Sequence, residues 1–314
     1  MSIKKLEEKL VIIIVTFNGV QWIQKCLDTC KGYHVIVVDN ASTDATVEII
    51  KSNYPAVTVL EQDRNLGFGA ANNIGMSYAL SEGCDYVFLL NQDAYIVPGC
   101  MEELVQVHKN NKNLGVLSPI QLNGTGTQLD DNFSMFLKRY KTNEVILYDA
   151  LKNQLKPFYP IEFVNAAAWL IPLKTLQVVG GFDPLFFHYG EDRNYCQRVL
   201  FHAYYIGVVT QAIIMHDRGD RKVSKMIPYS NKYYEEFERY AKVDWGDIRL
   251  DDFEEKINHK ISYMNKQAYK SLIQFDIKKF KDLKNKKKIL LKLKPQLIKS
   301  RNNNTVKNST YLNQ

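Results

Sequence analysis

The feature that most limits the possible folds is a repeated alternation of strand and helix patterns in the first hundred residues. Short apolar runs rich in β-branched residues indicate buried strands, and segments with apolar residues three and four apart favour helices. The strand patterns lie within residues 9–19, 33–40, 56–62 and 85–94, and the helix patterns within 20–31, 42–54 and 68–83. This alternation predicts an α/β fold with a mixed, mostly parallel sheet flanked by helices.

Polar residues follow each of these strands where the apolar run stops. The carboxyl ends of parallel strands meet at one edge of a sheet, and ligands bind beyond that edge. We therefore expect one polar rim built from residues 16–18, 39–40, 63–65 and 91–93. In the stretch LLNQDAYIVPG, Asn91 stands where a carboxylate would complete a metal-binding pair with Asp93, so these residues alone fit either a metal site or a turn.

The alternation loosens after about residue 115. The segment 121–131 has the composition of a loop, and EVILYD, at residues 144–149, is strand-like. A helix is expected from Glu191 to His202, and helices dominate beyond Tyr229, the last from about Ser271 until Pro295 ends it. These patterns predict a main domain of residues 1–225, a helical C-terminal extension of residues 226–295 and a polar, disordered tail of residues 296–314.

The positive charge is concentrated near the C-terminus. Residues 271–314 contain twelve Lys or Arg against two acids, a balance of +10, so the +7 of the whole chain leaves the other 270 residues at −3. This distribution does not support a nucleic-acid-binding body, and no nucleic-acid partner is expected. The basic segment fits either peripheral contact with anionic lipids or a solvated lysine-rich face.

The cysteines and the N-terminus bear on the cellular compartment. The five cysteines show no paired zinc-ribbon spacing, which favours reduced structural thiols. No N-terminal segment has the features of a signal peptide, and the run starting at Leu10 is too short to span a bilayer. We expect a cytoplasmic protein, either free or peripheral at the inner face of the membrane.

Five motifs occur in an order that resembles the family-2 glycosyltransferases: IVTFNG, VVDNASTD, NLGFGAANNIG, LLNQDA and GGFDPLFFHYGEDRNYCQRV. They cover roughly residues 10–220 and are most similar to the bacterial branch that includes rhamnosyltransferases. The resemblance implies a GT-A fold, with a Rossmann-like nucleotide-binding sheet in residues 1–225. It also implies inverting transfer of a sugar from a nucleotide diphosphate to an acceptor hydroxyl, with Mg²⁺ or Mn²⁺.

The strand ends offer groups suited to a nucleotide. Phe17 could stack on a base, and the Asp39 carboxylate could accept a hydrogen bond from a base N–H. The glycines at 67 and 69 would let the backbone approach a ligand closely. Each residue also has a purely structural explanation, as core, cap or tight turn. The resemblance assigns nucleotide and diphosphate contacts to Thr16, Phe17, Asn18, Asp39, Asn40, Asn65, Gly67, Asn72, Asn91 and Asp93.

The resemblance also assigns the chemistry. Asp93 is the implied metal ligand, His216 the candidate second ligand with Asp217 as its competitor, and Asn91 a ribose or water contact. One carboxylate is sufficient because Mg²⁺ keeps several waters and also binds phosphate oxygens. Asp192 matches the family's catalytic base, and Glu191 would orient it or the acceptor. An aromatic wall for the acceptor, or else part of the core, is expected from Trp169, Phe187, His188 and Tyr189.

The leading hypothesis is a glycosyltransferase for bacterial surface polysaccharide. Its donor would be dTDP-rhamnose or a UDP-hexose, and its acceptor a glycan or a lipid-linked sugar. A nucleotidyltransferase acting on sugar phosphates also uses a nucleotide-binding sheet, but it leaves GGFDPLFFHYGED unexplained. A non-catalytic, degenerate homologue is the third possibility, because Asn91 replaces an acid.

Overall fold

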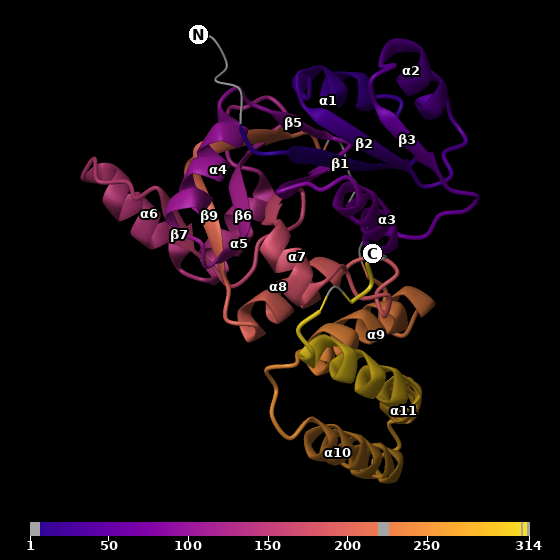
Figure 1. Ribbon diagram of the computed structural model, residues 1–314. Coiled ribbons are helices and arrows are strands. Elements are labelled where there is room, and N and C mark those ends of the chain that lie inside the picture. Colours follow the sequence, from indigo (N-terminus) through magenta and orange to yellow (C-terminus); the bar gives the residue numbers. More distant parts are fainter. Residues whose placement is uncertain (1–6, 219–225, 309, 313–314) are drawn as a thin grey trace.

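The computed structural model describes residues 7–218, 226–308 and 310–312. Within these residues the chain forms a nine-stranded mixed sheet in the order β3-β2-β1-β4-β8-β6-β9-β5, and β7 pairs with β9 beside this path (Figure 1). The strands are β1 (Leu10–Thr16), β2 (His34–Asp39), β3 (Thr58–Glu61), β4 (Tyr86–Asn91), β5 (Ala94–Ile96), β6 (Leu114–Asn123), β7 (Phe158–Pro160), β8 (Ala168–Pro172) and β9 (Tyr205–His216).

The first half of the sheet has the predicted parallel arrangement. Strand β1 pairs in parallel with β2 and β4, and β2 pairs in parallel with β3. The second half mixes directions, since β8 is antiparallel to both β4 and β6 while β6 and β9 are parallel. The predicted α/β class with a mixed sheet flanked by helices is confirmed.

Helices cover both faces of the sheet (Figure 1). Along β1, Val11 and Ile13 join one hydrophobic cluster while Ile12 and Ile14 join the other, as the twofold period of a strand requires. One face carries α1 (Ile23–Thr29), α2 (Thr46–Asn53) and α4 (Cys100–Asn110), and the other carries α3 (Phe68–Ser81), α5 (Asp131–Arg139), α7 (Leu173–Val179) and α8 (Glu191–Phe201). All five cysteines are buried and free, as predicted.

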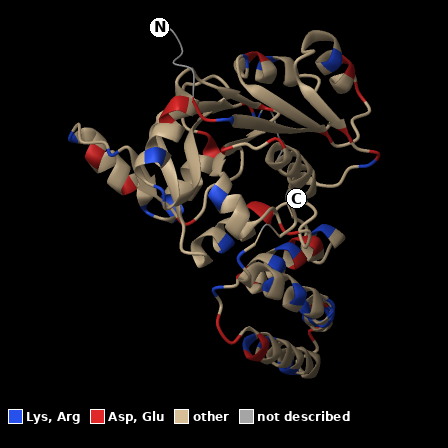
Figure 2. Ribbon diagram, viewed as in Figure 1, with Lys and Arg blue, Asp and Glu red and all other residues tan. Residues whose placement is uncertain are grey.

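Three C-terminal helices form an arm that projects from the sheet domain (Figure 1). They are α9 (Asn231–Gly246), α10 (Phe253–Ile273) and α11 (Ile277–Thr305), and we call residues 231–305 the arm. The arm has a hydrophobic cluster of its own that includes Ile257, Met264, Leu290 and Leu297. Lysines and arginines run along α9 and α11 (Figure 2). In the described part of the chain, no helix has both the length and the hydrophobicity needed to cross a bilayer.

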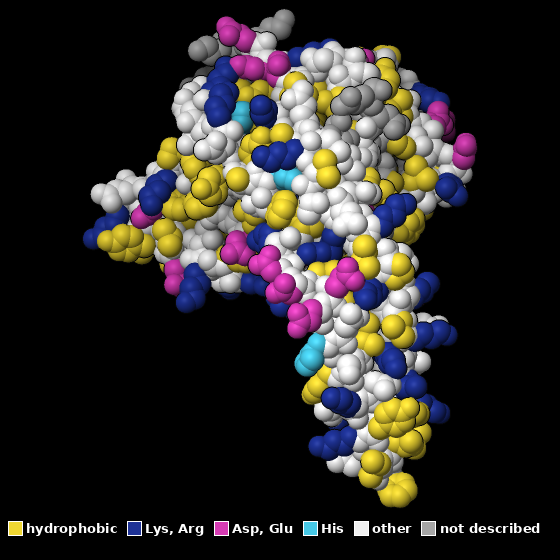
Figure 3. Space-filling view, turned by 60° about the horizontal axis from the view of Figure 1, so that its bottom comes forward, with side chains coloured by type: hydrophobic (Ala, Val, Ile, Leu, Met, Phe, Trp, Pro, Cys, Tyr) yellow, Lys and Arg dark blue, Asp and Glu magenta, His cyan; other side chains and the backbone are white. Residues whose placement is uncertain are grey.

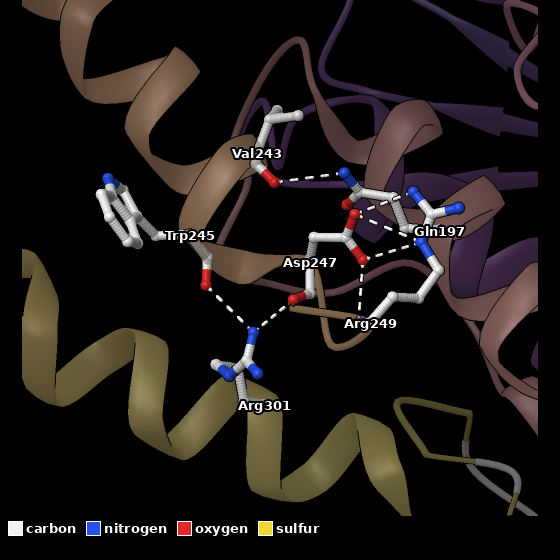
Figure 4. Close-up of polar contacts among 6 residues, drawn as sticks. All are labelled: Gln197, Val243, Trp245, Asp247, Arg249 and Arg301. Carbon is white, nitrogen blue, oxygen red and sulfur yellow. Dashed lines mark hydrogen bonds and ion pairs between the residues drawn. The ribbon is translucent and has the colours of Figure 1, made fainter. Parts of the chain in front are cut away.

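Hydrogen bonds fix the end of α9 to its neighbours (Figure 4). The Gln197 side chain, from α8, donates to the Val243 carbonyl at 3.2 Å. The Arg301 guanidinium, from α11, donates to the carbonyls of Trp245 and Asp247. Helix α9 is therefore held between the sheet domain and the rest of the arm.

Two sequence predictions about local structure are wrong. The segment EVILYD lies in helix α6 (Thr142–Leu151), although its β-branched residues favour a strand. The single helix expected from Ser271 is instead the end of α10, a short turn and the whole of α11.

Pro295 does not end the last helix. The prediction of a disordered tail from residue 296 depended on a helix end at this proline. It lies inside α11, which continues to Thr305. Leu293 and Leu297, on either side of the proline, are buried in the arm, so packing offsets the lost backbone hydrogen bond. The division of the chain into domains stays a prediction, and its boundary at residue 225 lies outside the described residues.

Candidate active site

A cavity of about 770 Å³ opens at the carboxyl ends of β1 and β4. Its lining includes residues of strands β1, β4 and β9 and of helices α5, α8 and α9. Most of the predicted site residues line this single cavity: Phe17, Asn40, Asn65, Gly67, Asn91, Asp93, Glu191, Asp192 and His216.

Four predicted contacts, Thr16, Asn18, Asp39 and Asn72, are engaged within the protein and do not line the cavity. The Asp39 carboxylate accepts hydrogen bonds from the Thr16 hydroxyl at 2.9 Å and from the Ser42 amide at 2.9 Å. The Asn18 side chain accepts from the Thr43 amide at 2.8 Å, and the Asn72 side chain donates to the Phe68 carbonyl at 2.9 Å. These bonds shape the rim behind the cavity wall.

Hydrogen bonds connect three of the predicted site residues, Asn40, Asn65 and Gly67, in one part of the cavity wall. The Asn40 side chain donates to Asn65 Oδ1 at 2.9 Å, and the same oxygen accepts from the Gly67 amide at 2.9 Å. Gly67 has φ +84°, and a Cβ added there would lie 1.9 Å from the Phe187 carbonyl oxygen. Glycine is therefore required at residue 67, both for its backbone conformation and for the close approach of the 187–190 loop.

Gln92 holds the Phe17 backbone in place, a role that no sequence motif indicated. The Phe17 amide donates to Gln92 Oε1 at 3.0 Å, and Gln92 Nε2 donates back to the Phe17 carbonyl at 3.2 Å. The Phe17 ring lines the cavity and is 44% exposed, so one face is open to a planar ligand such as a nucleobase.

The proposed metal ligands, Asp93 and His216, lie side by side. Residues Ala94 and His216 pair across β5 and β9, which brings His216 Nε2 within 3.4 Å of Asp93 Oδ1. Both side chains are buried, and neither His216 ring nitrogen has a hydrogen-bond partner within the described residues. Each nitrogen faces a carboxylate, Asp93 at 3.4 Å and Asp130 at 3.6 Å, without forming a hydrogen bond, so Nε2 is available to a ligand that Asp93 also binds.

The geometry of this pair fits a divalent cation. A carboxylate oxygen and an imidazole nitrogen are both ligands of divalent cations, and Asp93 Oδ1 and His216 Nε2, 3.4 Å apart, are close enough to hold the same ion. The described residues contain no group of three or more His, Cys, Asp or Glu side chains arranged to hold a metal ion. Phosphate oxygens and water would therefore complete the coordination of Mg²⁺ or Mn²⁺ here.

Two carboxylates near His216 have different surroundings. Asp130 Oδ2 lies 3.6 Å from His216 Nδ1, on the side of the ring away from Asp93. Asp217, the competing ligand candidate, accepts a hydrogen bond from the Tyr95 hydroxyl at 3.1 Å and does not line the cavity. Of the two candidates, His216 lines the cavity beside Asp93, and Asp217 does not.

Glu191 and Asp192 begin helix α8 at the cavity wall. Burial raises the pKa of Glu191 to about 8, and the charge of Asp192 adds to this effect. Burial also raises the pKa of Asp192, opposed by the backbone N–H of Arg193, which donates to Asp192 Oδ1 at 2.7 Å. Glu191 is therefore suited to keeping a proton near neutral pH, beside a second carboxylate at the cavity wall.

One part of the cavity lining is basic and aromatic. Arg239 stacks on Tyr189 and on Tyr240, with its guanidinium carbon 5.4 and 5.1 Å from the ring centroids. Of the aromatic residues proposed for an acceptor wall, His188 and Tyr189 line the cavity, whereas Phe187 does not, and Trp169 is core, stacked on Phe182. No sequence motif indicated the four arginines that line the cavity, Arg139, Arg193, Arg218 and Arg239.

Comparison with known proteins places the chain in a family. The profile of Glycosyl transferase family 2 matches residues 11–167, which is half of the chain. The dTDP-rhamnosyl transferase RfbF of Shigella flexneri is 22% identical in an alignment of 231 residues that covers 69% of this chain and 72% of RfbF. An N-acetylglucosaminyl-diphospho-decaprenol L-rhamnosyltransferase of Mycobacterium tuberculosis is 22% identical over 247 residues, covering 68% of this chain and 78% of that protein.

Solved structures share the fold. The mannosyltransferase PcManGT of Pyrobaculum calidifontis, in complex with GDP-Man and Mn²⁺, superposes with a TM-score of 0.53 at 16% identity, covering 78% of this chain and 64% of that one. Residues 1–349 of S. aureus TarS, in complex with UDP, give a TM-score of 0.50 at 13% identity and cover 92% and 91% of the two chains. These proteins have the GT-A fold, which confirms the predicted fold. The chain belongs to glycosyl transferase family 2.

Proposed function

We propose that this glycosyltransferase moves a sugar from a nucleotide diphosphate to an acceptor hydroxyl with inversion at the anomeric carbon. The observation that carries the proposal is that one cavity contains both the Asp93 and His216 pair and the Glu191 and Asp192 pair. The first pair suits a metal-bound diphosphate, and the second suits removal of a proton from the acceptor.

The nucleotide would lie against β1 and the 65–67 turn. The Phe17 ring would stack on the base, and Asn40, Asn65 and Asn91 would meet the ribose and phosphates with their amides. A divalent cation held by Asp93 and His216 would neutralise the charge that develops on the leaving diphosphate. Arg218, two residues after His216, also lines the cavity and adds positive charge.

Asp192 would act as the base. Its Oδ1 atom accepts a hydrogen bond from the Arg193 amide, and the carboxylate would accept the proton of the acceptor hydroxyl. The acceptor oxygen would bond to the anomeric carbon from the face opposite the diphosphate, and the bond from that carbon to the phosphate oxygen would break. Glu191 Oε2, which has no hydrogen-bond partner within the described residues, would bind the acceptor beside the base.

We further propose that the donor is dTDP-rhamnose or a UDP-hexose and that the product is a bacterial surface polysaccharide. The two rhamnosyltransferases among the relatives support this, and the name of the mycobacterial one includes a lipid diphosphate. A glycan or a lipid-linked sugar would be the acceptor, and the basic C-terminal segment would bring the enzyme to the inner face of the membrane.

A thermal-shift screen of nucleotide sugars, with and without Mn²⁺, tests the donor proposal directly. We expect stabilisation by a dTDP or UDP donor that depends on the metal, because a ligand that binds only the folded state raises the melting temperature. No shift with any dTDP or UDP compound would contradict the proposed donor class. A shift with sugar phosphates plus nucleoside triphosphates would instead favour a nucleotidyltransferase.

A further inference from the structure

The turn between α10 and α11 exposes a group of large apolar side chains. Phe275 is 90% exposed, Ile273 78%, Ile277 45% and Leu272 40%. We call residues 272–277 the arm tip. Large apolar side chains grouped on an exposed surface indicate a contact with another molecule. Figure 3 shows hydrophobic side chains gathered at the far end of the arm, with basic side chains along its sides.

The arm tip is a defined turn. The Phe275 amide donates to the Leu272 carbonyl at 3.0 Å, and the Asp276 amide donates to the Ser271 carbonyl at 2.9 Å. Asp276 also caps α11 by accepting from the Lys279 amide at 2.9 Å. Phe275 itself has φ +57°, a conformation that bulky residues rarely adopt. The backbone thus holds an aromatic ring outward at the end of the hairpin.

The arm does not need these side chains for its own core. Its buried residues, among them Met264, Ala268 and Leu290, lie further back along the two helices. The exposed side chains of the tip therefore add little to the stability of the arm, and folding alone gives no reason for their hydrophobicity.

Lysines surround the tip. Six exposed lysines lie within two turns of it: Lys266, Lys270, Lys278, Lys279, Lys281 and Lys284. Two turns of helix are about 10 Å long, comparable to the screening length at physiological salt, so these charges act together on a nearby anionic surface. The two acids of this region are occupied, Asp276 as the cap of α11 and Asp282 with Lys286 at 2.9 Å.

We propose that the arm tip inserts into an anionic lipid bilayer. An apolar wedge inside a ring of lysines matches a membrane surface, because the wedge reaches the acyl boundary while the lysines meet lipid phosphates. This deepens the membrane contact proposed above and rests on it, and it locates that contact at residues 272–277. Helix α9 packs on α11 and carries Arg239 and Tyr240 of the cavity lining, so the arm connects the tip to the cavity.

Vesicle sedimentation tests the proposal with the full chain. The probes are vesicles of phosphatidylcholine alone and of phosphatidylcholine with phosphatidylglycerol. We expect binding to the anionic vesicles only, at least about tenfold weaker for the double variant Ile273→Ser with Phe275→Ser. The matched control is Leu147→Ser with Leu151→Ser, since these α6 residues are 60% and 76% exposed but lie outside the arm. The control should bind as the wild type does.

A second measurement reports insertion itself. The variant Phe275→Trp should be quenched by brominated lipid in anionic vesicles, whereas Leu151→Trp should not. Transfer to a water-soluble acceptor should be unchanged in the tip variant, so failure of the transferase chemistry and failure of the membrane contact give different results. Unchanged vesicle binding of the double variant would overturn the proposal, as would loss of binding in the α6 control. Loss of self-association without loss of vesicle binding would assign the tip to a second copy of the chain instead.

Discussion

The Nδ1 atom of His216 lies 3.6 Å from Oδ2 of Asp130, and both side chains are buried. Asp130 is the N-cap of α5, where Oδ1 accepts from the Phe133 amide at 2.9 Å. A metal-binding histidine commonly faces a carboxylate with its second nitrogen, which fixes the ring and makes the ligating nitrogen more basic. Asp130 therefore has the position of a residue that orients His216 toward Asp93.

The variant Asp130→Asn should weaken metal binding without unfolding the protein. Asparagine caps a helix about as well as aspartate, so α5 should be retained. The negative charge beside His216 is lost, and the affinity for Mn²⁺ should fall about 10- to 100-fold. Electron paramagnetic resonance titration with Mn²⁺, with and without a nucleoside diphosphate, measures this.

The neighbouring variant Asp131→Asn is the control for this change. Asp131 lies in the first turn of the same helix and is exposed. Its replacement by Asn removes the same charge without changing the surroundings of His216. Equal Mn²⁺ affinities of the two variants would show that Asp130 does not support metal binding.

Asp192→Asn should abolish transfer and keep donor binding. The amide has nearly the same shape but cannot accept the acceptor proton, and general-base catalysis contributes about 10²- to 10⁴-fold to the rate. The kcat should fall by that factor, while the donor affinity from calorimetry should stay within about twofold of wild type. Glu238→Gln, on α9, serves as the control because Glu238 pairs with Lys242 at 3.0 Å and does not line the cavity. Normal turnover by Asp192→Asn would exclude Asp192 as the base.

Glu191→Gln should raise stability at alkaline pH. Burial raises the pKa of Glu191 from 4.5 to about 8, so the folded protein keeps a proton that the unfolded chain releases. The wild type therefore loses stability as pH rises from about 4.5 to about 8, whereas glutamine cannot ionise. Melting temperatures should agree near pH 4 and differ by a few degrees near pH 8.5. The exposed Glu235→Gln should show no such divergence, and a pH-independent difference for Glu191→Gln would contradict the explanation.

The sheet and its rim could be predicted because each strand has a recognisable pattern in the sequence. A parallel strand buried on both faces is a continuous apolar run, and the polar residues that stop it lie at the ligand edge. This reasoning placed Phe17, Asn40, Asn91 and Asp93 at one cavity.

The contacts between distant segments could not be found in this way. Asp130 comes from a segment with the composition of a loop, and Gln92 was expected at the rim without its hydrogen bonds to Phe17. Only the folded structure brings Asp130 beside His216 and Gln92 beside Phe17. The helical structure of α6 and the continuation of α11 past Pro295 also could not be predicted from local sequence preferences. In the second case the packing of Leu293 and Leu297 outweighs the local preference of proline.

Asn304→Ala should show that the end of α11 belongs to the folded core. The buried Asn304 side chain donates to Asp183 Oδ2 at 2.7 Å, beside Ser300, whose hydroxyl donates to the same oxygen at 2.6 Å. Removing one donor to a buried carboxylate should cost about 1–3 kcal/mol of unfolding free energy, measured by urea denaturation. Asn302→Ala, at an exposed position on the same helix, should cost less than about 0.5 kcal/mol. Equal costs would mean that the Asn304 side chain does not stabilise the core.

Gly67→Ala should destabilise the protein by more than the strain of its backbone conformation alone, and it should also disturb the cavity wall. Alanine at φ +84° is strained by about 1 kcal/mol, and its Cβ would also meet the Phe187 carbonyl at 1.9 Å. The 187–190 loop would have to move, carrying His188 and Tyr189 away from the cavity they line. Gly83→Ala is a matched control, because Gly83 has φ +72° but nothing within 4 Å of an added Cβ. We expect Gly83→Ala to lose about 1 kcal/mol with normal transfer, and Gly67→Ala to lose at least about twice that together with most of its activity. If the two variants were equally stable and equally active, the contact between Gly67 and the loop would not be needed for the site.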